Sequence, residues 1–193
     1  ITVEEAEAYN KASLEQLYAR LGMAPPPQES APEHRAQELI YEAWEASSSR
    51  QRVKLAREAL EIWPDCADAH VILAKDSARS LKAALEHYRR GVEAGERAIG
   101  AESEFEDAVG HFWGLLETRP YMRARAGLAD CLWRAGEHTE AVEHYRDMLI
   151  LNPGDNQGLR YILLTELLLL ERNDEAGELW GRYEDDASAQ WSY

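Results

Sequence analysis

The chain has 193 residues, of which 45% are hydrophobic and 30% are charged, a balance that excludes a disordered chain and an integral membrane protein. Its formal net charge of −15, from 21 Lys and Arg against 36 Asp and Glu, disfavours binding to nucleic acid and to anionic lipid surfaces. Ala, Leu, Glu and Arg are abundant while Val and Thr are scarce, which predicts an all-α protein.

The amino-terminal region is predicted to hold one helix followed by a linker. Residues 1–23 contain an amphipathic helical pattern from Val3 to Leu21. Residues 24–32 are proline-rich and form the linker, because proline lacks the amide donor that a helix needs. No signal peptide is visible, and the longest apolar run, Leu159–Leu170, is far shorter than the roughly 20 residues of a membrane span. We therefore expect a cytoplasmic protein that does not bind membranes.

The remainder, residues 33–193, is predicted to be one domain of helix pairs. Apolar residues recur at helical spacing, and short turns rich in Ser, Gly, Asn or Pro separate the helices. Short connections force neighbouring helices to run antiparallel. The predicted units are a degenerate repeat at 33–64, repeats at 67–100, 122–155 and 157–186, an inserted helix at 104–117, and the start of a further helix at 187–193.

The segment from Met122 to Asp155 is 34 residues long and carries the clearest pattern. Small residues, Ala129 on its first helix and Ala141 on its second, let the two helices approach closely. Gly136 makes the turn, and Pro153 ends the unit because proline cannot continue a helix. This arrangement resembles the tetratricopeptide repeat (TPR). The resemblance implies antiparallel helix hairpins stacked as a short right-handed superhelix, an α-solenoid.

Neighbouring segments repeat the pattern less completely. The tetrapeptide Glu86–Arg89 recurs as Glu143–Arg146 at the same repeat position, which is internal evidence for a repeat. The degenerate repeat departs from the pattern because Arg52 stands where a small residue is expected.

Several segments are similar to bacterial relatives of the suppressor-of-tumorigenicity family. They are Ala69–Ala74, Gly91–Gly100, His111–Gly114, Thr118–Arg125, Asn152–Gly158 and Tyr183–Asp186. The resemblance covers most of the chain from about Ala36 onward and implies a repeat scaffold, with little information about mechanism.

The sequence predicts neither an enzyme nor a metal or cofactor site. His111, beside Phe112 and Trp113, is the best candidate for ligation or acid–base chemistry, but no H-E-x-x-H, C-x-x-C or clustered His/Cys spacing accompanies it. The sequence also lacks a glycine-rich phosphate loop and a nucleophile-elbow motif. Cys66 and Cys131 are expected to be reduced packing residues.

A groove for a protein or peptide is the leading hypothesis. In a TPR hairpin the first helix lines the concave wall, and arginine beside aromatic side chains suits a carboxylate with an apolar anchor. Projection of the repeat places seven residues on this wall: Arg123, Asp130, Trp133, Arg134, Tyr161, Thr165 and Leu168. Alternatively, the arginines pair with nearby glutamates or with the inserted helix around Trp113, which fills the groove.

Two functions remain open from the sequence. The first is a non-catalytic scaffold that binds a protein or peptide partner of unknown identity in the concave groove. The second is a structural domain that fills its groove with its own helices and associates into a homo-oligomer.

Overall fold

The computed structural model describes Arg20 and residues 31–186. The predicted amino-terminal helix apart from Arg20, most of the predicted linker and the predicted helix start at 187–193 lie outside this part of the chain. Within residues 31–186 the protein is helical and contains no strand, as predicted for an all-α protein. The helices are α2 (Pro32–Glu45), α3 (Ser49–Ile62), α4 (Ala67–Asp76), α5 (Leu81–Ile99), α6 (Glu102–Ala108), α7 (Arg119–Ala135), α8 (His138–Leu151), α9 (Leu159–Leu169) and α10 (Asn173–Arg182).

Local side chains define several helix ends. The hydroxyl oxygens of Ser48 and Ser80 accept hydrogen bonds from the first turns of α3 and α5. The carboxylate of Asp155 likewise accepts a hydrogen bond from the amide of Leu159, at 2.7 Å, at the start of α9. Gly136 ends α7 in the left-handed conformation, with φ of 87°, that glycine adopts without steric cost.

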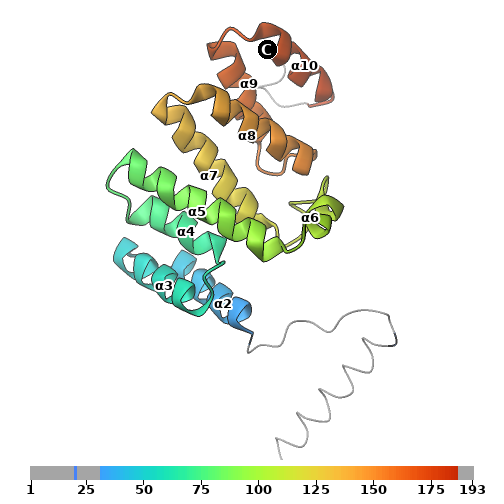
Figure 1. Cartoon of the computed structure of the whole chain (residues 1–193). Helices are drawn as coiled ribbons and strands as arrows, with labels where there is room; N and C mark the ends of the chain where they lie inside the picture. The colour runs from blue at the N-terminus through green and yellow to red at the C-terminus, as the bar shows by residue number, and fades with distance from the viewer. Residues whose placement is uncertain (1–19, 21–30, 187–193) are drawn as a thin grey trace, which may run out of the picture.

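The helices pack in pairs along the chain. Four consecutive pairs are in contact, α2 with α3, α4 with α5, α7 with α8 and α9 with α10. Each pair then contacts the next, through α3 with α4, α5 with α7 and α8 with α9. Figure 1 shows the pairs following one another from α2 at one end to α10 at the other, with α6 set to one side. The short connections within the pairs make each one an antiparallel hairpin.

Small residues occupy the positions where the helices cross most closely. A Cβ atom on Gly127 of α7 would lie 2.1 Å from Cε1 of Tyr88 on α5, so any larger residue here would force the buried Tyr88 ring to move. Ala129 and Ala141, the two small residues singled out in the sequence, are both fully buried. Close packing of neighbouring helices therefore depends on side-chain size at these positions.

The segment between α5 and α7 differs from the prediction of a helix over 104–117. Helix α6 ends at Ala108, and turns follow up to the start of α7. Gly110 has φ of +90°, and its amide donates to the carbonyl of Leu151 at 2.9 Å instead of continuing a helix. The predicted extent was wrong because a left-handed glycine and a hydrogen bond to the distant end of α8 stop the helix.

The described helices include none with both the length and the apolar character needed to cross a membrane.

Candidate functional site

The first members of the four pairs, α2, α4, α7 and α9, form a surface that we call the first-helix face. Arg123 of α7 links three of these helices. Its guanidinium donates to both carboxylate oxygens of Asp68 on α4, at 2.7 and 2.6 Å. Its Cζ atom also lies 5.1 Å from the ring centroid of Trp44 on α2. These contacts place α2, α4 and α7 next to one another on one face of the molecule.

The ion pair between Arg123 and Asp68 belongs to the helix packing. The Asp68 side chain is 1% exposed, so its carboxylate has lost its water and depends on the bidentate guanidinium for compensation. Arg123 was predicted as a groove residue. In the structure its guanidinium pairs with Asp68 and so holds α7 against α4. The Arg123 side chain is 29% exposed.

The two other arginines near the start of α7 are also engaged. Arg119 donates to the carbonyl oxygen of Trp113 at 2.9 Å, and its Cζ lies 5.6 Å from the indole centroid. Arg125 donates to Asp147 at 2.5 Å. All three arginines, Arg119, Arg123 and Arg125, are therefore paired or covered by neighbouring groups.

An aromatic cleft lies at the α2 end of the first-helix face. It has a volume of about 420 Å³, and its walls come from α2, Trp63 after the end of α3, α5 and the residues around the start of α7. Tyr41 and Trp44 form one wall with ring centroids 5.6 Å apart, and they are 56% and 44% exposed. Leu116, which is 66% exposed, also lines the cleft. Exposed aromatic and apolar side chains around a concavity are typical of a recognition site.

A second cleft lies between α7 and α9, and we call it the α7–α9 cleft. Helix α7 packs against α4, α5 and α8 but hardly touches α9, so the first helices stand apart here. The resulting space has a volume of about 350 Å³. It is lined by Trp133, Tyr161, Ile162, Thr165, Glu166 and Leu169. The indole of Trp133 is held by the His138 ring, with centroids 4.2 Å apart.

Glu166 is the acidic residue of this cleft. Its side chain is 5% exposed, and its Oε2 atom has no hydrogen-bond partner within the part of the chain that the structure describes. Burial, with a smaller contribution from Asp130, raises the pKa of the Glu166 carboxyl to about 7. The group therefore titrates near neutral pH, unlike an exposed glutamate.

The seven residues predicted to share one groove are divided by the structure. Trp133, Tyr161 and Thr165 meet in the α7–α9 cleft, whereas Arg123 borders the aromatic cleft. The other three lie outside both sets of cleft-lining residues: Asp130 and Arg134, which form an exposed ion pair at 3.5 Å, and Leu168, which is 54% exposed.

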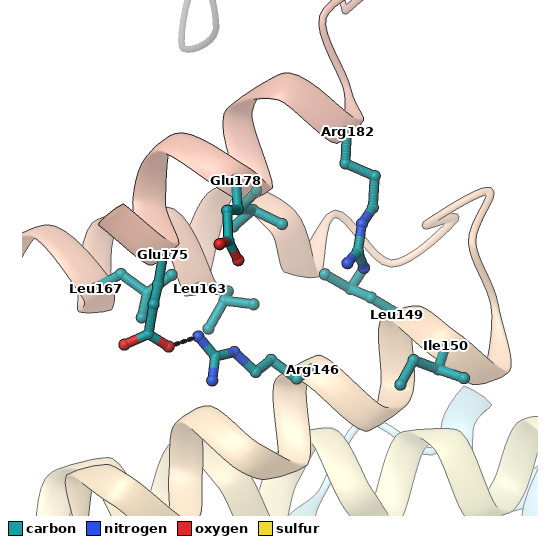
Figure 2. A pocket seen from close by; sticks show the side chains of 9 residues that line it. Arg146, Leu149, Ile150, Leu163, Leu167, Glu175, Glu178 and Arg182 are labelled. Carbon is teal, nitrogen blue, oxygen red and sulfur yellow. Dashed lines mark hydrogen bonds and ion pairs between the residues drawn. The ribbon is translucent and has the colours of Figure 1, made fainter. Parts of the chain in front are cut away.

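A third, smaller cleft lies between α8 and α10, on the second helices of the last two pairs. It has a volume of about 220 Å³. Figure 2 shows Arg146 of α8 extending to Glu175 of α10, with Leu163 of α9 between the two helices. The guanidinium of Arg146 donates to the Glu175 carboxylate, so a charged bridge spans this cleft.

His70, His87 and the two cysteines lie in packing positions, whereas His111, the candidate for ligation or acid–base chemistry, is exposed. His70 and His87 face each other across α4 and α5 with ring centroids 6.1 Å apart. Burial lowers the pKa of both, that of His70 to about 4, so the pair is neutral at pH 7. Cys66 and Cys131 are free and buried, as predicted for packing residues. Among the described residues no group of three His, Cys, Asp or Glu side chains converges as metal ligands would.

Residues 28–176, which include both clefts of the first-helix face, match the family of the ST7 protein. The match spans most of the chain, and the chain therefore belongs to the ST7 protein family.

Individual relatives agree with this assignment. The chain is 26% identical over 156 residues to a Suppressor of tumorigenicity 7 protein-like from Gallus gallus, an alignment that covers 76% of this chain and 27% of the relative. The human protein of the same description is also 26% identical over 156 residues, with 76% and 26% covered. A Protein ST7 homolog from Caenorhabditis elegans is 31% identical over 119 residues, with 58% and 22% covered. The chain thus spans about a quarter of the length of these curated relatives. No solved structure matches.

Proposed function

We propose that this chain is a TPR-type scaffold of the ST7 protein family that binds an extended segment of a partner protein along its first-helix face. The helical pairs serve as the framework, and the two clefts of that face receive side chains of the partner. No catalytic step is assigned to the chain.

The repeat assignment is supported by sequence and packing together. The unit from Met122 to Asp155 has the TPR period of 34 residues. Its two small residues, Ala129 and Ala141, are fully buried within α7 and α8. The second helix of each hairpin contacts the first helix of the next hairpin, which is the contact pattern expected of a solenoid. On this basis we propose a short right-handed superhelix whose concave wall is the first-helix face.

The observation that carries the proposed function is that aromatic side chains line both clefts of this face, exposed in the aromatic cleft and half-buried in the α7–α9 cleft. Tyr41 and Trp44 border one cleft, and Trp133 and Tyr161 border the other. Aromatic residues dominate the binding energy of protein interfaces because they bury a large rigid surface at low entropic cost. Two such clefts suit an extended partner segment that inserts one anchoring side chain into each cleft.

Catalysis is not proposed because the titratable groups serve packing in this arrangement. His70 and His87 oppose each other with lowered pKa values, and the thiol of Cys66 has its pKa raised to about 12 by burial. A nucleophilic cysteine requires the opposite shift.

The test selects peptides from a random display library on the immobilised chain and maps them by NMR chemical-shift changes. Selected peptides are expected to shift resonances of α2, α7 and α9. Tyr41→Ala and Trp133→Ala each remove one aromatic wall and should weaken binding at least about tenfold, the effect of losing a hot-spot residue. Ile150→Ser on α8, where the native side chain is 56% exposed, is the control and should leave binding unchanged.

Selected peptides that shift only α3, α8 and α10, or that ignore both aromatic substitutions, contradict the proposal. Light scattering over a dilution series separates the alternative of a self-associating domain. If the chain forms a dimer and dimerisation changes the NMR chemical shifts of residues in the same two clefts, another copy of the chain occupies this face.

A further inference from the structure

The α7–α9 cleft contains a buried acid that lacks a counter-charge. Glu166 is 5% exposed, and no described residue donates to its Oε2 atom. An ionised carboxylate removed from water without a donor or cation is strongly unfavourable, so protein interiors rarely keep one. Burial therefore favours the neutral form of the Glu166 carboxyl in the free protein, and a cation placed beside it would favour the ionised form.

The cations nearest in sequence to the cleft are already committed. Arg134 pairs with Asp130 at 3.5 Å. Arg160 pairs with Asp155 at 2.9 Å and with Asp186 at 2.7 Å. Neither guanidinium donates to Glu166, so this carboxyl has no cationic partner among the residues that the structure describes, and a bound cation would be its first.

The walls of the cleft suit the side chain that would carry such a charge. Trp133 and Tyr161 provide aromatic surface, and Ile162 and Leu169 provide apolar surface. Lysine and arginine combine a long aliphatic stem with a terminal cation, and they pack the stem on apolar or aromatic walls. The chain's net charge of −15 also favours the approach of a basic segment.

We propose that the α7–α9 cleft receives one basic side chain, a lysine or arginine, of the partner segment and pairs its charge with the buried carboxylate of Glu166. This proposal rests on the proposed function, because it specifies one side chain that the bound segment carries. The occupant is a basic residue of another protein, with its stem against Trp133.

The ionisation of Glu166 makes binding in the cleft depend on pH. Asp130 of α7 acts electrostatically on Glu166, Glu166 in turn acts on the hydroxyl of Tyr145 on α8, and Tyr161 lies with Glu166 on α9. Because the pKa of Glu166 is about 7, a bound cation has to ionise the carboxyl, and binding releases a proton near neutral pH. The affinity for a permanently charged ligand should therefore rise about tenfold between pH 6 and pH 8, in proportion to the ionised fraction.

The experiment compares two matched probes by NMR titration of the whole chain. One is an acetylated, amidated alanine-rich peptide with a central arginine, and the other carries citrulline, which keeps the shape of arginine and lacks its charge. The arginine peptide should shift α7 and α9 resonances and bind at least about tenfold more tightly than the citrulline peptide. Glu166→Gln should abolish this preference and its pH dependence, while Glu178→Gln on α10 makes the same change in net charge and should preserve both.

Several results would overturn the inference. If the arginine and citrulline peptides bind in the cleft with equal affinity, this inference is wrong, but the proposed function is not contradicted. Arginine-dependent shifts confined to other acidic surfaces, or no shifts in the cleft at millimolar peptide, would also overturn it. Cleft shifts that appear on concentrating the chain without peptide would show a second copy as the occupant. Far-ultraviolet circular dichroism of Glu166→Gln confirms that the variant is folded, so that a lost preference reports on the carboxylate.

Discussion

Replacement of Arg123 by alanine tests how much of the first-helix face depends on one buried ion pair. The substitution removes the bidentate partner of Asp68, whose side chain is 1% exposed, and the cation that lies over Trp44. Asp68 would then be buried without its guanidinium partner.

The magnitude follows from the burial of the two partners. Removal of one member of a buried ion pair costs about 3–5 kcal/mol, because the remaining charge is uncompensated. Arg123 itself is 29% exposed, so water can reach part of the vacated site, and we expect the lower part of this range. Loss of the contact with Trp44 adds about 0.5–1 kcal/mol. The double variant Asp68→Ala with Arg123→Ala should be more stable than Arg123→Ala alone, because it removes the stranded charge.

Denaturant unfolding followed by circular dichroism measures these differences. Arg134→Ala is the matched control, since its pair with Asp130 has 63% and 61% exposed side chains at 3.5 Å. An exposed pair of this kind contributes roughly 0–1 kcal/mol. If Arg123→Ala and Arg134→Ala lower the free energy of unfolding equally, the Asp68 carboxylate is not held as the contacts indicate.

Three further substitutions or conditions probe the packing. Gly127→Ala should lower the free energy of unfolding by about 1–3 kcal/mol, because its Cβ would meet Tyr88. Gly177→Ala on α10 has no atom within 4 Å of the added Cβ and should raise the free energy of unfolding by about 0.5–1 kcal/mol. Equal effects of the two substitutions in thermal melts would contradict the packing of Gly127 against Tyr88. The pKa of His70 is lowered to about 4, so the folded chain binds fewer protons than the unfolded chain between pH 4 and 6.5, and stability falls as the pH drops through this window. The wild type should lose up to about 2 kcal/mol more than His70→Gln over that range, and parallel pH profiles would refute this. Burial raises the pKa of the Cys66 thiol to about 12 and leaves it 1% exposed, so a thiol reagent should modify it only as fast as the chain unfolds; rapid native-state labelling would show an open α4.

Helix content and pairing could be predicted from the sequence because they depend on local patterns. Apolar periodicity and turn residues such as Gly136 act within a few positions. The end of α6 could not be found in this way, since Gly110 is held by the carbonyl of Leu151, a contact between distant segments. A glycine within a helical pattern was compatible with either a continued helix or a stop.

The candidate site was predicted in part for the same reason. Trp133, Tyr161 and Thr165 follow from helix projection, because each first helix presents its residues to one face. The pairing of Arg123 with Asp68 spans 55 positions and depends on how α4 and α7 cross, which the pattern does not specify. Glu166 was missed although a signal existed, namely a single acid within the apolar run Leu159–Leu170. An acid flanked by leucines on a packed helix has to be buried or to face a cleft.

A crystal structure of the whole chain with an arginine-containing peptide selected on it tests the central claim most directly. We expect the peptide to lie across α2, α7 and α9, with its guanidinium within hydrogen-bonding distance of Glu166 and its stem against Trp133. A peptide bound to the α3, α8 and α10 surface, with Glu166 still unpaired, would contradict the account.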